Sequence, residues 1–253
     1  MHELYPYLPF ALILCLGIFV QSAAGFAAGL LTIPVLLWFG YSIPEAQTSL
    51  LVATIPQNLW GVWSFRDAID VSKVTWPGLT RILFVPVGIV VLQTLETFSI
   101  VTLRQFVGGV VLIVTLTIVF FNPKPRASLH PIWACLTFPT SGFLQGLVGM
   151  GGPPMVFWVQ AHDWDTRKMR GFLFAAYLIS LFPALGFLYG GFGTRIIEPG
   201  IIAASLTPLL LLATYAGLKL GTWLGRVRLR RITLALLVLI GIAGLAAPLF
   251  SHH

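Results

Sequence analysis

Eight apolar runs occupy most of the chain, and they constrain its fold more than any other feature. They cover about residues 8–40, 47–64, 79–95, 104–121, 131–161, 171–190, 200–224 and 232–250. An apolar helix of about 20 residues spans the hydrocarbon core of a bilayer, which is about 30 Å thick. Only 9% of the residues are charged, whereas a soluble domain carries about a quarter. The sequence therefore predicts an all-α integral membrane protein and excludes a water-soluble enzyme.

Two of the runs, 8–40 and 131–161, are too long for one spanning helix. Thirty helical residues would be about 45 Å long. Each run carries small residues near its middle, Gly25-Phe-Ala-Ala-Gly29 in the first and Gly149-Met-Gly-Gly-Pro-Pro154 in the second. Glycine relaxes the backbone and proline removes a hydrogen-bond donor, so helices break at such places. We expect each run to form two helical pieces joined by a turn, as a hairpin that either spans the membrane or re-enters it.

The two breaks belong to an internal repeat. A shift of 124 residues places Gln21 and Gly25 over Gln145 and Gly149, and the order of the runs repeats with it. Each half then has one broken run followed by three single runs. We therefore predict two transmembrane repeats, 1–126 and 127–253, in one membrane domain. Internal duplication is frequent in secondary transporters.

The loop charges indicate that the second repeat is inverted. If each broken run begins and ends on the same side of the membrane, the two halves have opposite orientation. One side then holds two cations, Arg104 and Arg195. The other holds thirteen: Arg66, Lys73, Arg81, Lys124, Arg126, Arg167, Lys168, Arg170, Lys219, Arg226, Arg228, Arg230 and Arg231. Eight plain spans would divide the cations nine to six. Because cytoplasmic loops are rich in Lys and Arg, we predict an inverted repeat with both termini outside. We attribute the net charge of +7 to these cytoplasmic loops, which set the orientation of the protein in the membrane, rather than to nucleic-acid binding.

The breaks are the candidate binding site. A helix that begins after each break points its N-terminus into the protein, where free N–H groups and a partial positive charge suit an anion. The candidate residues at the breaks are Gly25, Gly29, Gly149, Gly151 and Gly152. Alternatively, these glycines allow close helix packing, and the two roles are compatible.

Polar residues in the apolar runs extend the candidate site. Gln21 and Gln145 each lie four residues before a break, where they can contact a ligand or form interhelical hydrogen bonds. The second run adds Thr48, Ser49, Gln57 and Asn58. Unpaired amides are costly in hydrocarbon, so this group favours a polar cavity. Arg170, at the mouth of the sixth run, either guards the anion route or anchors the helix on the cytoplasmic side.

Several other chemistries are not expected. The carboxylates fall in the loops between the runs or before the first run, so the sequence indicates neither a proton relay nor a sodium site of acidic residues at mid-membrane. Cys15 and Cys135 both lie in apolar runs, which argues against a disulfide framework or a metal cluster. An intramembrane protease would need a nucleophile with a buried partner, and Ser141 has no histidine near it in the sequence. We expect no cofactor.

The segment Gln21-Ser-Ala-Ala-Gly25-Phe-Ala-Ala-Gly29-Leu-Leu-Thr-Ile-Pro34, followed by Glu45-Ala-Gln-Thr48-Ser49, resembles the first signature of the TauE/SafE sulfite-exporter permeases. Gly149–Pro154 resembles its second copy, and the resemblance extends over nearly the whole chain. There are departures: Ala27 and Ala28 replace expected glycines, Trp158 replaces a proline, and Gly171-Phe172 replaces a Thr-Ser pair. They predict a less symmetric site.

The resemblance implies a secondary transporter in a bacterial inner membrane, surrounded by lipid, with both termini in the periplasm. Its substrate would be a small sulfur-containing anion such as sulfite, thiosulfate or an organosulfonate. The alternative is an anion channel or a membrane subunit of a larger complex.

Overall fold

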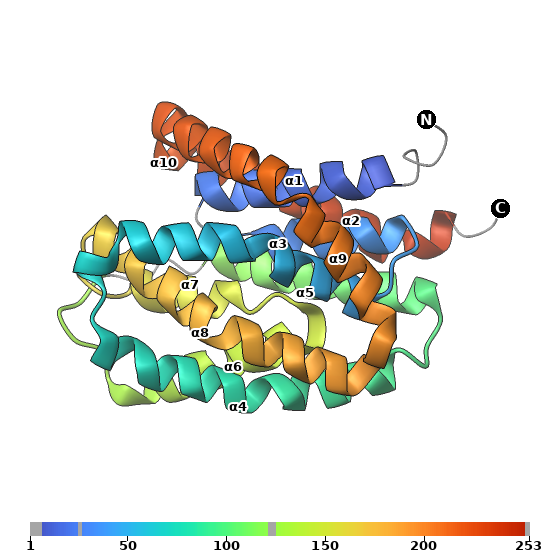
Figure 1. Cartoon of the computed structure of the whole chain (residues 1–253), viewed down its shortest axis with the longest axis horizontal. Coiled ribbons are helices and arrows are strands. Elements are labelled where there is room, and N and C mark those ends of the chain that lie inside the picture. The colour runs from blue at the N-terminus through green and yellow to red at the C-terminus, as the bar shows by residue number, and fades with distance from the viewer. Residues whose placement is uncertain (1–6, 25–26, 121–124, 251–253) are drawn as a thin grey trace.

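The computed structural model describes residues 7–24, 27–120 and 125–250. The α-helices in chain order are α1 (Tyr7–Ala24), α2 (Ala28–Trp38), α3 (Ile43–Ser64), α4 (Val71–Leu95), α5 (Ile100–Phe120), α6 (Pro131–Val148), α7 (Gly152–Gln160), α8 (Thr166–Phe192), α9 (Ile197–Ser205) and α10 (Thr207–Leu245). Three short 3-10 helices, η2 (Arg66–Ala68), η3 (Gly193–Ile196) and η4 (Ala247–Phe250), lie between or after them. Most of the helices run along the long axis of one bundle (Figure 1).

The surface of the bundle is apolar where a soluble protein would be polar. Among the described residues, three helical stretches are long and apolar enough to cross a membrane: Val71–Leu95, Ile100–Phe120 and Thr166–Ser205. Large apolar side chains such as Leu83 on α4 and Ile113 on α5 are exposed on the outside. Lipid solvates such side chains, and helices satisfy their own backbone groups there. The prediction of an all-α membrane protein is confirmed.

Both long apolar runs are broken at the small residues. The first run forms α1 and α2, and the second forms α6 and α7. Both bounds of α6 lie 124 residues after those of α1 (7 to 131 and 24 to 148), and α7 begins 124 residues after α2 (28 to 152). The helices of the two broken runs are thus offset by the same 124 residues as the sequence repeat. The inverted relation between the two halves stays a prediction.

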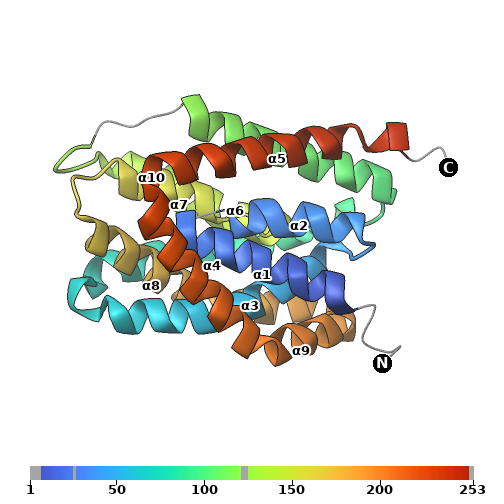
Figure 2. The ribbon, with the colours of Figure 1, turned by 90° about the horizontal axis from the view of Figure 1, so that it is seen from above.

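The end of the chain differs from the expected pair of separate helices. The runs at 200–224 and 232–250 form the short α9 and then one continuous helix, α10, which bends sharply in its middle (Figure 2). The N-terminus of α10 coincides with Thr207-Pro208, and proline is favoured in the first turn of a helix. No further proline occurs before Pro248. The helix therefore continues through the basic segment, because Lys and Arg are good helix formers.

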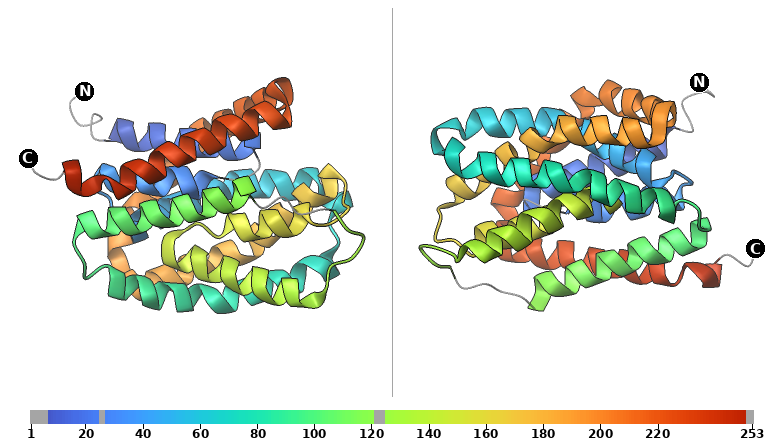
Figure 3. Two further views of the ribbon diagram at one scale, coloured as in Figure 1. Left: turned by 180° about the vertical axis from the view of Figure 1, so that it is seen from behind. Right: turned by 90° about the horizontal axis from the view of Figure 1, so that it is seen from below.

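The two halves exchange helices rather than folding side by side. Helix α4, from the first half, packs along α6 of the second (Figure 3), and the first part of α10 packs along α1. Glycines permit both contacts: a Cβ at Gly146 would collide with the backbone of α4, and one at Gly217 would collide with the backbone of α1. The halves are intertwined in one body.

The turns gather at two ends of the bundle. Helix α1 begins and α10 ends at one end, together with the turns at 39–42 and 96–99 (Figures 1 and 2). The turns at 65–70, 125–130 and 161–165 lie at the opposite end. That second end carries most of the described cations outside α10.

Candidate functional site

A small cavity lies where the two helix breaks face each other. It has a volume of about 60 Å³ and is lined by residues of both breaks and by the middle parts of α3, α4 and α8. Six predicted site residues line it: Gln21, Gly29, Asn58, Gln145, Gly149 and Gly152. Because α3, α4 and α8 each contribute residues near their middle, the cavity lies about half-way along the bundle. Residues of both breaks therefore line one cavity.

At the first break, helix α2 begins inside the protein. Its N-cap residue, Ala27, has a φ of 90°, the left-handed conformation that is unfavourable for a residue with a Cβ. The N–H groups of residues 27–30 have no partner within the helix, and all four residues line the cavity. This break offers a row of backbone donors.

The second break is built differently. Gly149 ends α6 with a φ of 66°, and the N–H groups of Gly149 and Met150 bond the carbonyl oxygens of Gln145 and Leu144. This is the usual left-handed end of a helix. Helix α7 then begins with Gly152-Pro153-Pro154. Since proline has no N–H, the start of α7 offers fewer backbone donors than the start of α2.

The two breaks touch through glycine and amide contacts. A Cβ at Gly29 would lie 2.5 Å from the carbonyl oxygen of Gly149, so only a glycine fits between them. Nearby, the Nε2 of Gln47 on α3 donates to the carbonyl oxygen of Gly146 at 3.4 Å. These contacts hold the N-terminal and C-terminal halves together at the cavity.

The cavity contains a buried arginine that the sequence had placed in a loop. Arg81 is only 1% exposed and lies near the middle of α4. Its backbone is pressed against α6, because a Cβ at Gly142 would collide with the carbonyl oxygen of Arg81. The side chain crosses towards α8, where Nη1 donates to Ala176 O at 3.2 Å and to Ser180 Oγ at 2.7 Å. Its assignment to the cytoplasmic loops is wrong.

The guanidinium of Arg81 has no countercharge among the residues that the structure describes. The ion pairs of the described residues are Lys73–Asp70, Arg167–Asp67 and Arg195–Glu96, and none involves Arg81. Its buried Nε donates no hydrogen bond within the described chain. The ring of Tyr177 lies 5.4 Å from the guanidinium carbon, a cation–π contact. A buried charge without a partner costs several kcal/mol, so this group is poised for an anion.

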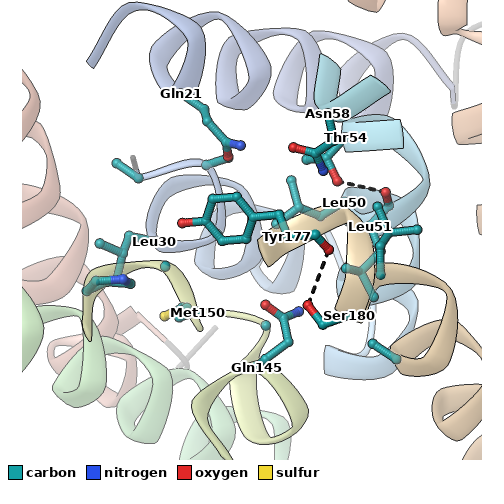
Figure 4. Close-up of a pocket in the computed structure, with 18 of the residues that line it drawn as sticks. Gln21, Leu30, Leu50, Leu51, Thr54, Asn58, Gln145, Met150, Tyr177 and Ser180 are labelled. Atoms are coloured by element: carbon teal, nitrogen blue, oxygen red, sulfur yellow. Dashed lines mark hydrogen bonds between the residues drawn. The ribbon is translucent and has the colours of Figure 1, made fainter. Parts of the chain in front are cut away.

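Amide and hydroxyl groups surround the same space. Figure 4 shows Tyr177 reaching into the cavity, with Gln21 and Asn58 on one side and Gln145 and Ser180 on the other. In the part of the chain that is described, the side chains of Gln21, Asn58 and Gln145 form no hydrogen bond, although Asn58 is only 2% exposed. The interhelical bonds considered for the two glutamines are not found there. These amides are available to a ligand.

The other predicted site residues lie elsewhere. Ser49 donates to its own helix at Glu45 O, and the Cγ2 of Thr48 packs against α9 at Gly200. Gln57 donates to Ser22 Oγ on α1 at 2.7 Å, an interhelical bond. Residues 54 and 58 share the cavity face of α3 because they are four apart, whereas 48, 49 and 57 point in other directions.

Three further positions complete the predicted set. Gly151 accepts a hydrogen bond from Ser141 Oγ through its carbonyl oxygen and lies beside the cavity: a Cβ there would be 3.0 Å from Arg81 Nη2. Arg170 lies in the second turn of α8 and is not among the residues that line the cavity. Gly25 falls outside the described residues.

Arg81, Tyr177, Ser180 and Thr54 line the cavity but were not predicted. For Arg81 a signal did exist. Asp70 immediately precedes α4, and Asp is a preferred residue at a helix start; hydrogen bonds from Ser72 and Lys73 lower the pKa of Asp70 to about 2. A helix that begins there places Arg81 about three turns inside the bundle.

The chain was compared with known proteins. A family model described as "Sulfite exporter TauE/SafE" matches residues 10–244. A relative from Cupriavidus necator, described as a probable sulfite/organosulfonate exporter TauE, is 24% identical over 255 residues, covering 98% of this chain and 96% of the relative. No solved structure matches the chain. With the family model spanning nearly all of its length, this chain belongs to the TauE/SafE family of membrane transporters.

Proposed function

We propose that the protein is a secondary transporter that carries a small sulfur-containing anion, such as sulfite, thiosulfate or an organosulfonate, across a bacterial inner membrane. The family and the name of the Cupriavidus relative support this substrate class. The observation that carries the proposal is the buried Arg81, which has no carboxylate partner among the described residues. An anion in the cavity supplies the missing charge.

The residues around Arg81 suit an oxyanion. An S–O oxygen accepts hydrogen bonds, and the cavity offers donors in the amides of Gln21, Asn58 and Gln145 and in the backbone at the start of α2. Hydrogen bonds to a charged ligand contribute about 1.5–3 kcal/mol each. The guanidinium provides the attraction, and the surrounding donors fix the orientation of the ligand.

The position of the site favours alternating access. Both broken helices contribute to one cavity half-way along the bundle, and the halves that carry them exchange their packing helices. In transporters built from inverted repeats, one repeat rocks against the other around such a site. Movement of α1–α2 relative to α6–α7 would open the cavity to one side and then to the other.

The orientation follows from the charges at the two ends of the bundle. The end with the turns at 65–70 and 161–165 is rich in Arg and Lys and faces the cytoplasm. Both termini are then periplasmic. A single cysteine at Asp165 should react with a membrane-impermeant reagent only from the cytoplasm, and one at Glu45 only from the periplasm. Reaction of both from the same side would contradict the inverted repeat.

Flux into proteoliposomes tests the function. The purified protein should move sulfite or an alkanesulfonate down an imposed gradient. With the membrane potential held at zero, preloaded unlabelled anion should accelerate uptake of labelled anion, which a channel does not do under that condition. Arg81→Gln should abolish this flux, while Arg66→Gln, at an exposed position, should retain it. Equal flux in the wild type and Arg81→Gln would overturn the role of Arg81. Gradient-driven flux without counterflow would favour a channel.

A further inference from the structure

The described lining of the cavity carries one formal charge. Of the described residues that line it, only Arg81, from α4, is ionised at neutral pH. The other titratable lining group is Tyr177 of α8, a neutral phenol. The described lining residues of α1, α2, α3, α6 and α7 include no carboxylate, lysine or histidine.

The helix ends at the cavity add donors but little net charge. The start of α2, with a partial positive charge, lies beside the C-terminal end of α1, which carries the opposite partial charge. The start of α7 and the end of α6 meet in the same way at 148–152. At each break the C-terminal end of one helix, with its partial negative charge, lies next to the N-terminal end of the following helix, with its partial positive charge. The two partial charges therefore largely cancel. The net charge that a ligand meets is close to that of Arg81 alone.

The remaining described lining offers hydrogen-bond donors but no second positive charge to pair with a second negative one. Much of it is apolar, including Leu30, Leu50, Leu51 and Met150 (Figure 4). A monoanion beside Arg81 forms a neutral pair in this setting. A dianion leaves one uncompensated charge in a volume of about 60 Å³, too small to retain its hydration shell.

We infer that the cavity selects singly charged oxyanions and excludes doubly charged ones. Sulfite therefore binds as hydrogensulfite, and an organosulfonate binds as it is. Sulfate and thiosulfate, both dianions at neutral pH, are rejected because of their charge, which removes thiosulfate from the proposed substrates. This inference rests on the proposed function and adds the charge state of the substrate to it. The apolar lining also gives room to a small alkyl group, so methanesulfonate is a suitable probe.

The first test uses the pH dependence of binding. Affinities of sulfite and methanesulfonate for the full-length wild-type protein in detergent are measured by calorimetry across the second ionisation of sulfite. At pH values above the pKa of hydrogensulfite, the affinity for total sulfite should fall about tenfold per pH unit. The affinity for methanesulfonate should stay constant over the same range. The methanesulfonate series reports any titration of the protein itself. Sulfite affinity that is constant or rises with pH would overturn the inference.

The second test adds a charge to the cavity. Gln145→Lys should raise the affinity for sulfate relative to methanesulfonate at least about tenfold, and the neutral Gln145→Met should not. Asn58→Lys tests the same point from α3. If both folded lysine variants keep the wild-type preference, or if wild-type protein binds sulfate as tightly as methanesulfonate, charge selection is wrong. If the wild type binds none of the three anions, the proposed function fails together with the inference.

Discussion

The two helix breaks occupy equivalent places in the repeat but differ in how they are built. The first has Ala27 in a left-handed conformation and a following helix with a full set of free N–H groups. The second has Gly149 in that conformation and a following helix that begins with two prolines. Arg81 lies beside the second break, where a Cβ at Gly151 would be 3.0 Å from its Nη2, and its counterpart after a shift of 124 residues is Ser205. The first break thus supplies a row of backbone donors to the cavity, whereas the second, with two prolines at the start of its following helix, supplies fewer.

The largest effect is expected at the second break. Gly149→Ala places a Cβ at a φ of 66°, where it would collide with Ile33 Cδ1 and lie 2.9 Å from Gln47 Cγ. Backbone strain and overpacking together should lower the free energy of unfolding by about 2–4 kcal/mol. Gly186→Ala is the matched control, because a Cβ there meets no atom within 4 Å. Thermal or denaturant unfolding in detergent measures both variants, and equal stability of the two would show that Gly149 does not need its left-handed conformation.

A smaller effect should follow when a donor is restored to α7. Pro153→Ala gives the first turn of α7 an additional N–H at the cavity. One more hydrogen bond to an anion should tighten binding by up to about tenfold. Pro208→Ala, at the start of α10 and not among the cavity-lining residues, should leave the affinity unchanged. An affinity that Pro153→Ala does not improve would mean that the start of α7 does not face the anion.

The smallest effect is expected at the first break. Ala27→Gly removes a Cβ from a residue with a φ of 90°, which should raise the free energy of unfolding by up to about 1 kcal/mol. Ala28 is the first residue of α2, and Ala28→Gly should instead destabilise by up to about 0.5–1 kcal/mol. If both substitutions destabilise equally, Ala27 is not strained, and the two breaks are more alike than the structure indicates.

The sequence predicted the breaks well because glycine and proline act locally. Small residues cluster at 25–29 and 149–154 near the middle of runs too long for one spanning helix, so the four helical pieces followed from the sequence. The repeat spacing also follows from residues that recur after 124 positions.

The cavity wall was harder to predict because it depends on helix rotation and on where α4 begins. Hydropathy begins the third run at residue 79, whereas α4 begins at Val71, so Arg81 was taken for a loop residue. Gln57 and Asn58 are neighbours in the sequence, but the side chain of one bonds α1 and the other lines the cavity. Which of two adjacent polar residues faces a ligand is decided by packing between halves, and periodicity alone does not contain that information.

The most direct test of the account is whether an anion stabilises the protein through Arg81. The thermal unfolding of wild type and Arg81→Met is compared in detergent, with and without methanesulfonate at about 100 times its dissociation constant for the wild type. The wild type should gain about 2.7 kcal/mol from the ligand. Arg81→Met should be at least as stable as the ligand-free wild type, because it loses an unpaired buried charge, and it should gain nothing from the anion. A folded Arg81→Met protein that the anion stabilises as much as the wild type would contradict the account.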